Sequence, residues 1–178
     1  MTKKIILVFS ITLLALLSYS YIFVWQNNIQ ECLVDVLEKE VKGQSMQPIL
    51  QNGEKIDLYI DYYKKCNIIP KKWDIIAYNY FWSKHLLIKQ IHANQNDIIT
   101  NSWSLLLINN KVLKNSAWEI YNFRENEMKI ILFFVKNNKL SNDNYLIFGD
   151  NIHNSIDSRK FWAVNKNDFL GKFKLNFD

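Results

Sequence analysis

The sequence has few of the residues that break regular structure and few of those that bind metals. Its 178 residues include 4 glycines, 2 prolines, 2 cysteines and 3 histidines, whereas glycine and proline usually make up about 7% and 5% of a protein. No low-complexity linker is present, and each glycine is expected where the backbone needs it. The histidines form no H-E-x-x-H pair; they are His85, His92 and His153. We therefore expect no metal and no other cofactor.

Charge of one sign is not concentrated in any segment either. The formal net charge is +5, and lysines are mixed with acidic and aromatic residues, as between positions 61 and 73. A basic composition alone is weak evidence of nucleic-acid binding, so we expect no nucleic-acid partner. With 49% apolar and 15% aromatic residues, the chain has the length and the side chains for one domain with a true core.

The long apolar run lies near the N-terminus. Residues 5–25 carry no charge, and Tyr19, Tyr21 and Trp25 gather at the far end. About 20 apolar residues span a bilayer, and aromatic rings favour its interface. Lysines precede the run and acidic residues follow it, so the sequence predicts a single-pass protein of the inner or plasma membrane. Its parts would be a cytoplasmic N-terminus at 1–4, an anchor at 5–25 and an extracytoplasmic domain at 26–178.

A cleaved signal peptide is the alternative interpretation of this run. Its apolar region would be only about 7–15 residues long and would end at a small-residue cleavage site, and the sequence after the run offers no good site of this kind. Export would place Cys32 and Cys66 in an oxidising compartment, where a disulfide is permitted. Their spacing does not require one, so the sequence leaves this bond open. We do not expect a catalytic cysteine.

Short strand-like segments follow residue 53. They are rich in β-branched and aromatic residues and are separated by Asn, Lys or Pro. They cover residues 55–60, 73–82, 85–91, 97–103, 105–113, 145–149 and 169–175. Asn109-Asn110 suits a tight hairpin turn. The segment 31–41 fits either a short helix or a lead-in strand. Residues 115–143 are less regular and are expected to form an insertion with one strand at 130–135.

The predicted fold class is mainly β. We expect a catalytic domain of short antiparallel strands with minor helix, preceded by one transmembrane helix. No long helical period competes with the strand pattern after the apolar run.

A lysine lies on an apolar face of the segment 85–91. Alternate residues of a strand share a face, so Lys89 points the same way as Leu87 and Ile91. On an edge strand such a lysine discourages aggregation. If it is buried, desolvation lowers its pKa from about 10.4 toward the 7–8 that suits a general base. A neutral amine can then take the proton of a serine hydroxyl. This segment alone does not decide between the two interpretations.

A serine stands in a short stretch with no helical or strand pattern, GQSMQP, from Gly43 to Pro48. Gly43 permits a close approach of the chain, and Pro48 stiffens the exit. The stretch lacks the G-x-S-x-G spacing of the α/β-hydrolases, because Gln47 stands where the second glycine belongs. By itself, Ser45 is a serine in a turn.

A polar loop at 149–159, GDNIHNSIDSR, contains Asp150, Ser155, Asp157 and Arg159. Asn and Asp favour turns through local hydrogen bonds, which is one interpretation of the loop. In the other, Asp157 and Arg159 pair with each other and Ser155 orients a neighbouring amine.

Together these segments resemble the type I signal peptidases, also called leader peptidases. These are membrane-anchored Ser-Lys serine proteases that remove leader peptides from exported proteins. The serine box of the family reads S-M-x-P-T-L, and residues 45–50 read SMQPIL. A later box reads G-D-N-x-x-x-S-x-D-S-R, and residues 149–159 fill every named position. The resemblance runs from Val41 to Lys172, apart from a stretch near 115–143.

The resemblance implies a role for each matching residue. Ser45 would be the nucleophile and Lys89 its general base, and Ser155 would hydrogen-bond the amine of Lys89. Asp157 and Arg159 would brace the loop. The backbone N–H of Ser45 would stabilise the oxyanion.

Other positions qualify these roles. Asp150 belongs to the same box and is a supporting residue by that match. Gly43 stands where some members carry a serine that adds an oxyanion donor, so that donor is absent here. Gln90 replaces the family's arginine after the lysine. The turn that follows must be built differently, because other residues replace its Gly, Pro and Gly, namely Ala93, Gln95 and Asn96.

The implied substrates are exported preproteins with small residues at positions −1 and −3 from the cut. Membrane lipid is a second expected partner, and secretion or conjugation machinery a third. The chain resembles the maturation peptidases of conjugative pili almost as well, so a dedicated pilin peptidase is an alternative.

Two other classes of protein share part of this pattern. One is a non-catalytic envelope relative that binds peptides, against which the retention of both Ser45 and Lys89 argues. The other is a self-cleaving repressor, which also uses Ser and Lys but needs a DNA-binding head and no membrane span.

Overall fold

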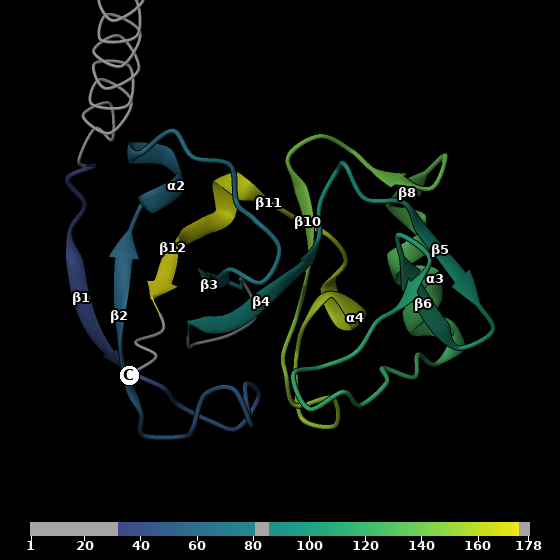
Figure 1. Cartoon of the computed structure of the whole chain (residues 1–178), viewed down its shortest axis with the longest axis horizontal. Coiled ribbons are helices and arrows are strands. Elements are labelled where there is room, and N and C mark those ends of the chain that lie inside the picture. Colours follow the sequence, from purple (N-terminus) through teal and green to yellow (C-terminus); the bar gives the residue numbers. More distant parts are fainter. Residues whose placement is uncertain (1–31, 81–85, 175–178) are drawn as a thin grey trace, which may run out of the picture. The chain divides into compact units, whose positions relative to one another are not determined.

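The computed structural model describes residues 32–80 and 86–174 (Figure 1). The chain divides into two compact units, Met1–Leu33 and Val34–Asp178, and only Cys32 and Leu33 of the first unit are described. The predicted cytoplasmic N-terminus and anchor therefore lie outside the described residues, as does His85. The described ranges contain no helix that is long and apolar enough to cross a membrane. Both cysteines, whose state the sequence left open, are disulfide-bonded.

A seven-stranded antiparallel sheet forms the larger part of the second unit. Its strand order is β1-β2-β12-β3-β4-β10-β11. The bounds are β1 Val36–Glu40, β2 Lys55–Ile60, β3 Ile75–Tyr78, β4 Leu87–Ala93, β10 Asn144–Phe148, β11 Val164–Asn165 and β12 Phe169–Lys174. The prediction of a mainly β fold with antiparallel strands is confirmed. The segment at 31–41 contributes a strand, β1, and no helix.

A smaller region follows β4 in the chain. It contains a three-stranded sheet of β5 Ile99–Ser102, β6 Leu105–Ile108 and β7 Lys111–Val112, and a hairpin of β8 Val135–Lys136 and β9 Lys139–Leu140. The helices of the described ranges are short: α2 Tyr62–Lys65, α3 Glu125–Phe133, α4 Ser158–Phe161 and the 3-10 turn η1 Lys166–Asp168. The predicted Asn109-Asn110 turn is confirmed, since both residues have positive φ, 53° and 62°, as a tight hairpin requires.

The strand expected at 130–135 is wrong, because residues 125–133 form helix α3. Two local features start this helix. The backbone N–H of Arg124 donates to the Glu127 carboxylate at 3.0 Å, and its guanidinium pairs with the same group at 2.7 Å. Met128 and Ile131, one helical turn apart, are both buried against the core. Capping and packing of one helical face thus outweigh the β-branched character of the segment.

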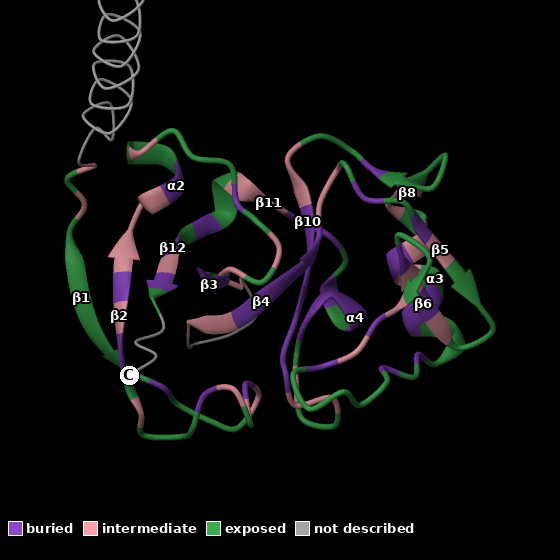
Figure 2. Cartoon of the chain, viewed as in Figure 1, coloured by how far each residue is buried: buried purple, intermediate pink, exposed green. Residues whose placement is uncertain are grey.

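The central strands are buried on both faces (Figure 2). Along β3, Ile76 packs into one apolar cluster with β4 and β10, while Ile75 and Ala77 pack into another with β2 and β12. This alternation follows from the two-residue period of a strand. Strand β1, in contrast, is exposed along its length. The middle of the sheet, where β4 lies, is therefore shielded from solvent on both faces.

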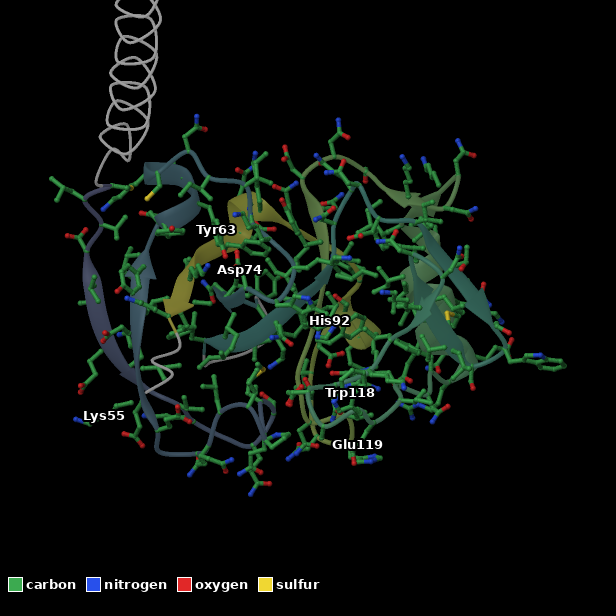
Figure 3. The ribbon with its side chains drawn as sticks, in the orientation of Figure 1. Lys55, Tyr63, Asp74, His92, Trp118 and Glu119 are labelled. Atoms are coloured by element: carbon green, nitrogen blue, oxygen red, sulfur yellow. The ribbon has the colours of Figure 1, made fainter. Side chains whose placement is uncertain are left out.

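Asp74, just before β3, links three elements of the sheet unit (Figure 3). Its carboxylate accepts a hydrogen bond from the Tyr63 hydroxyl of α2 at 2.9 Å, and Lys172 of β12 pairs with it at 2.6 Å. The approach of β12 to β2 is close enough to require glycine at 171, since a Cβ there would lie 2.3 Å from the Tyr59 carbonyl oxygen. These contacts hold β12, which flanks β3, against β2 and α2.

Candidate active site

The serine box is held against the sheet by its apolar members. Met46 and Leu50 are 1% exposed and belong to the cluster that also contains Ala77 of β3. Gly43 has a φ of 93°, and its N–H donates to the side-chain oxygen of Asn52 at 2.8 Å. A residue with a Cβ is strained in that backbone conformation. The box therefore folds as a turn anchored on both sides of Ser45.

Lys89 lies in the middle of the sheet. Its strand, β4, has β3 on one side and β10 on the other, so the edge-strand interpretation of this lysine is wrong. The side chain is buried, with 1% of its surface exposed. Its Nζ lies 2.9 Å from the Ser45 Oγ and donates to the Ile88 carbonyl oxygen at 2.7 Å. The structure thus brings together the two residues that the sequence predicted to act as a pair.

Burial shifts the protonation of this lysine. The pKa of Lys89 is lowered to about 8, chiefly by desolvation and to a smaller extent by the charge of Arg159, while the charge of Asp157 acts in the opposite direction. A neutral amine is therefore accessible at mildly alkaline pH. Such an amine, within hydrogen-bond distance of a hydroxyl, is the arrangement that a general base and its nucleophile need.

The polar loop at 149–159 packs directly on the serine box. The N–H of Asn151 donates to the Ser45 carbonyl oxygen at 3.0 Å. A Cβ at Gly149 would lie 2.5 Å from that same oxygen and 2.1 Å from the Ser155 Oγ. Only glycine allows the loop to come this close to Ser45.

Asp157 and Arg159 form a hydrogen-bonded pair within this loop. Asp157 is fully buried and accepts hydrogen bonds from Arg159 Nε at 2.8 Å and Nη2 at 2.7 Å. The same carboxylate accepts the N–H of Gly149 at 3.1 Å, and Arg159 Nη1 donates to the Ile152 carbonyl oxygen at 2.6 Å. A bidentate pair of this kind fixes geometry as well as charge. It joins both ends of the loop to its middle.

Asp150 differs from Asp157 and Arg159, because its side chain binds a segment outside the loop. Its carboxylate is buried and accepts hydrogen bonds from the backbone N–H of Ser116 at 2.8 Å and from the Ser116 hydroxyl. The side-chain nitrogen of Asn115 donates to the Asp150 carbonyl oxygen at 3.1 Å. Asn115 and Ser116 were missed from the sequence, because they lie in the stretch that matches no motif. Asp150 connects that stretch to the loop and does not contact the dyad.

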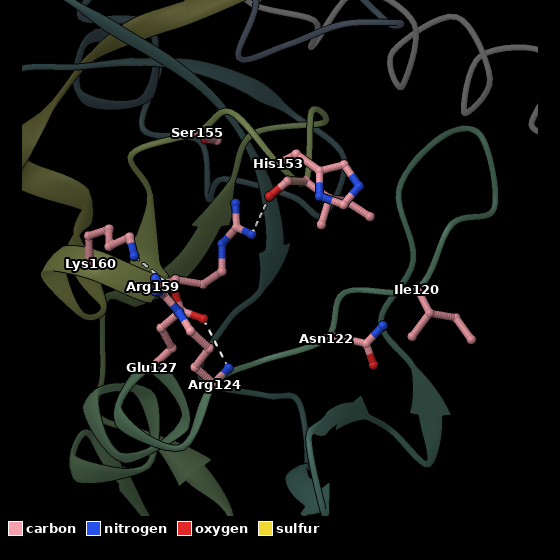
Figure 4. A pocket seen from close by; sticks show the side chains of 9 residues that line it. Ile120, Asn122, Arg124, Glu127, His153, Ser155, Arg159 and Lys160 are labelled. Atoms are coloured by element: carbon pink, nitrogen blue, oxygen red, sulfur yellow. Dashed lines mark hydrogen bonds and ion pairs between the residues drawn. The ribbon is translucent and has the colours of Figure 1, made fainter.

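Ser155 lies close to Gly149, but its hydroxyl forms no hydrogen bond with the Lys89 amine. Its Oγ is buried and has no hydrogen-bond partner in the described part of the chain. It lines a pocket of about 400 Å³ together with His153, Arg124 and Glu127 (Figure 4). Its role in orienting the lysine therefore stays a prediction.

Neither of the two histidines in the described ranges forms a hydrogen bond with Ser45 or Lys89. His153 is exposed, and its backbone N–H donates to the Asn151 side chain at 3.2 Å. His92 is buried among aromatic rings, and this burial lowers its pKa to about 3. The base nearest to Ser45 is thus Lys89.

Comparison with known proteins adds to this geometry. A family model described as signal peptidase, peptidase S26, matches residues 4–177. Signal peptidase I P of Bacillus subtilis subsp. natto is 29% identical over 143 residues, 77% of this chain and 74% of that protein. Signal peptidase IB of Staphylococcus aureus is 25% identical over 147 residues, 77% and 75% of the two chains. A crystal structure of a signal peptidase I from Enterococcus faecalis V583 is 22% identical with a TM-score of 0.41, covering 58% of this chain and 96% of that one.

Proposed function

Since the chain belongs to the signal peptidase family, peptidase S26, and is a serine endopeptidase, we propose that it removes leader peptides from exported preproteins with a dyad of Ser45 and Lys89. The observation that carries this proposal is the 2.9 Å separation of the Lys89 Nζ from the Ser45 Oγ in a buried setting. It accounts for a nucleophile and its base without a histidine or a metal.

The reaction proceeds in two halves. Neutral Lys89 takes the proton of Ser45 as its Oγ attacks the carbonyl carbon at the cleavage point. The resulting ammonium returns this proton to the leaving amine, and the mature protein departs with its new N-terminus. Lys89 then takes a proton from water, which attacks the acyl-enzyme, and Ser45 recovers its proton as the leader is released.

Two backbone groups prepare the dyad for this role. The Ile88 carbonyl oxygen accepts from the Lys89 Nζ and fixes the direction of the amine. The backbone N–H of Ser45 would stabilise the oxyanion, an interaction that is worth about 3 kcal/mol for one donor. Gly43 supplies no side-chain donor, so the oxyanion depends on backbone groups at this position.

The charge-free run at 5–25 supports a membrane anchor with a cytoplasmic N-terminus. The domain from residue 26 onward would then work outside the cytoplasm, at the surface where leader cleavage sites emerge, with membrane lipid as a partner. Secretion or conjugation machinery would deliver the substrates. A dedicated pilin peptidase uses the same dyad and differs only in its range of substrates.

The test is the effect of Ser45→Ala on precursors. The full chain should cut a preprotein with alanine at −1 and −3, and Ser45→Ala should abolish the cut, whereas Ser102→Ala, an exposed serine on β5, should not. In cells that produce the protein, mass spectrometry of the membrane and secreted fractions should show precursors accumulating with Ser45→Ala. Accumulation of many different precursors would support a general enzyme. Accumulation of a single pilin-like precursor would support a dedicated enzyme. Cleavage by Ser45→Ala at the wild-type rate would contradict the proposal.

A further inference from the structure

A second cleft, larger than the pocket beside Ser155, lies outside the dyad. Its volume is about 750 Å³, within the range of roughly 300–1,000 Å³ that is common for ligand sites. Apolar side chains from β6, β7 and the residues after them line it, including Ile108, Val112 and Leu113. Two tryptophans, Trp73 and Trp118, complete its walls. The proposed reaction uses none of these residues.

Both tryptophan rings are exposed where they line the cleft. Trp118 is 79% exposed and Trp73 is 60% exposed, and both have positive φ, 66° and 73°. The other described tryptophans, Trp103 and Trp162, also have positive φ, so it is the position of these two rings on the cleft wall, and not their backbone conformation, that distinguishes them. In Figure 3, Trp118 lies below His92, toward the lower edge of the view. Large exposed aromatic rings beside apolar surface are typical of a binding site.

A buried histidine lines the same cleft. His92 is 2% exposed, and neither of its ring nitrogens has a hydrogen-bond partner among the described residues. The Trp73 ring contacts it edge to face, with 4.9 Å between the ring centroids. Its imidazole is neutral, because burial lowers its pKa to about 3, so it offers one donor and one acceptor. Buried polar groups without partners are rare, and this one points to a ligand with polar groups of its own.

The charged side chains that line the cleft are all lysines, whereas the carboxylates of Glu119 and Asp150 are hydrogen-bonded to the lining residues Asn115 and Ser116. Lys72, Lys111 and Lys114 line it, and no carboxylate does. Lys72 is paired with Asp97 at 2.8 Å, whereas no ion pair involves Lys111 or Lys114 within the described ranges. The Lys114 Nζ lies 5.6 Å from the centre of the Trp118 ring. The cleft is therefore complementary to a ligand that is both acidic and apolar.

The cleft is connected to the nucleophile. Asn115 and Ser116 line it and hold Asp150 through its carbonyl oxygen and its carboxylate. The next residue, Asn151, donates to the Ser45 carbonyl oxygen. One short segment thus joins the wall of the cleft to the residue that attacks the substrate. A polypeptide bound at Ser45 is the ligand that this connection favours.

We propose that this cleft binds the part of the exported protein that follows the cleavage point, where that part carries acidic side chains next to aromatic or aliphatic ones. A leader is basic at its start and apolar in its middle, so the acidic partner of the lysines belongs to the mature side. This inference rests on the proposed function, because it takes a preprotein as the substrate.

A binding experiment tests the cleft without cleavage. The full chain with Ser45→Ala is titrated with two labelled peptides that share one leader and cleavage site. One continues with Glu and Phe residues, and the other with Ser and Gly. The acidic continuation should bind about tenfold more tightly, and Trp118→Ala or the double variant Lys111→Glu/Lys114→Glu should remove about that factor. Equal binding of the two peptides by the Ser45→Ala chain would overturn the inference.

Matched controls separate the cleft from general charge. Lys136→Glu/Lys139→Glu changes the net charge equally on exposed lysines of the β8–β9 hairpin that line none of the clefts described. Trp103→Ala removes another exposed tryptophan. Both should keep the preference for the acidic peptide. A peptide that continues with Lys and Phe should bind Lys111→Glu/Lys114→Glu more tightly than the parent. Equal losses in the hairpin and cleft variants would overturn the inference.

Cleavage by the chain with Ser45 intact distinguishes this inference from the proposed function. If both peptides are cut at equal kcat/KM, the function stands and the cleft proposal fails. If neither is cut but the binding preference persists, the cleft proposal stands as peptide binding and the proposed function fails. We expect both to be cut, the acidic one with the lower KM.

Discussion

Lys89 places an ionisable amine at one of the most buried positions in the sheet. Because its pKa is about 8, the amine holds its proton below that pH and cannot accept one from Ser45. We therefore expect kcat/KM to rise with pH, with a midpoint near 8. Lys89→Arg keeps the charge and removes any accessible neutral form, so it should be inactive. A pH series with a fluorogenic leader peptide measures both.

His153 provides the control for this prediction, because it lies in the polar loop at 149–159 that packs on the serine box. His153→Ala should keep most of the activity and the same midpoint. An inactive His153→Ala together with an active Lys89→Arg would transfer the role of base to the histidine.

The same burial affects stability. The pKa of Lys89 is about 8 in the folded chain, below the value of about 10.4 expected when unfolded. Below both values the two states bind the proton equally, and this group adds no pH dependence. Between them the unfolded state binds more protons, so the free energy of unfolding rises with pH, by on the order of 3 kcal/mol in all.

Urea unfolding of the parent and of Lys89→Met checks this rise. The parent should gain stability relative to Lys89→Met between about pH 8 and about pH 10. A constant difference across this range would show that Lys89 titrates alike in both states.

The polar loop at 149–159 and strand β12 each contain one glycine that allows a close approach of the backbone. Alanine substitutions at these two glycines can therefore be compared. In Gly149→Ala the new methyl group would meet Ser155 and the Ser45 carbonyl oxygen, and in Gly171→Ala it would meet the Tyr59 carbonyl oxygen. Each should cost about 1–3 kcal/mol of stability. Only Gly149→Ala moves the loop away from Ser45, so kcat/KM per folded molecule should fall far more in that variant. Equal activity in the two folded variants would contradict the role given to this loop.

The elements differ in how far the sequence determines them. Strands with clear alternation, such as 55–60, and the hairpin turn at Asn109-Asn110 could be predicted, because pattern and turn residues agree. Helix α3 could not, because its apolar run has the composition of a strand and only the Arg124–Glu127 contacts reveal its start. The position of β4 inside the sheet, which decides the state of Lys89, depends on pairings distant in the sequence.

The site shows the same division. The resemblance to the type I signal peptidases implied Ser45 and Lys89 as a pair, and the structure brings them together. Asn115, Ser116 and the cleft around His92 could not be predicted, because their importance arises from contacts across more than 30 residues, such as Asn115 with Asp150 at a separation of 35. Short polar residues in an unmatched stretch give no signal of their own.

For the whole molecule, the proposed orientation has a direct test. With a cytoplasmic N-terminus, the domain after residue 26 would face outward, because lysines precede the apolar run and acidic residues follow it. Protease added to intact spheroplasts should digest this domain, while a cytoplasmic marker protein stays intact. Full protection of the domain until the membrane is dissolved would reverse the topology.

The order of strands in the sheet also determines how early during synthesis the active site can assemble. Strand β12, at residues 169–174, lies between β2 and β3, and no hydrogen bonds join those two strands directly. A chain that emerges from a ribosome or a translocation channel N-terminus first therefore presents β2 and β3 long before the strand that joins them. Ser45 precedes β2 in the chain and Lys89 lies in β4, which pairs with β3, so we expect the two residues to meet only when the last strand has joined β2 to β3. Chains terminated after Asp168 should be protease-sensitive and inactive, whereas a stable, active product would show that the dyad assembles without β12. The newly made peptidase would thus be unable to cut its own neighbours, or itself, during its synthesis.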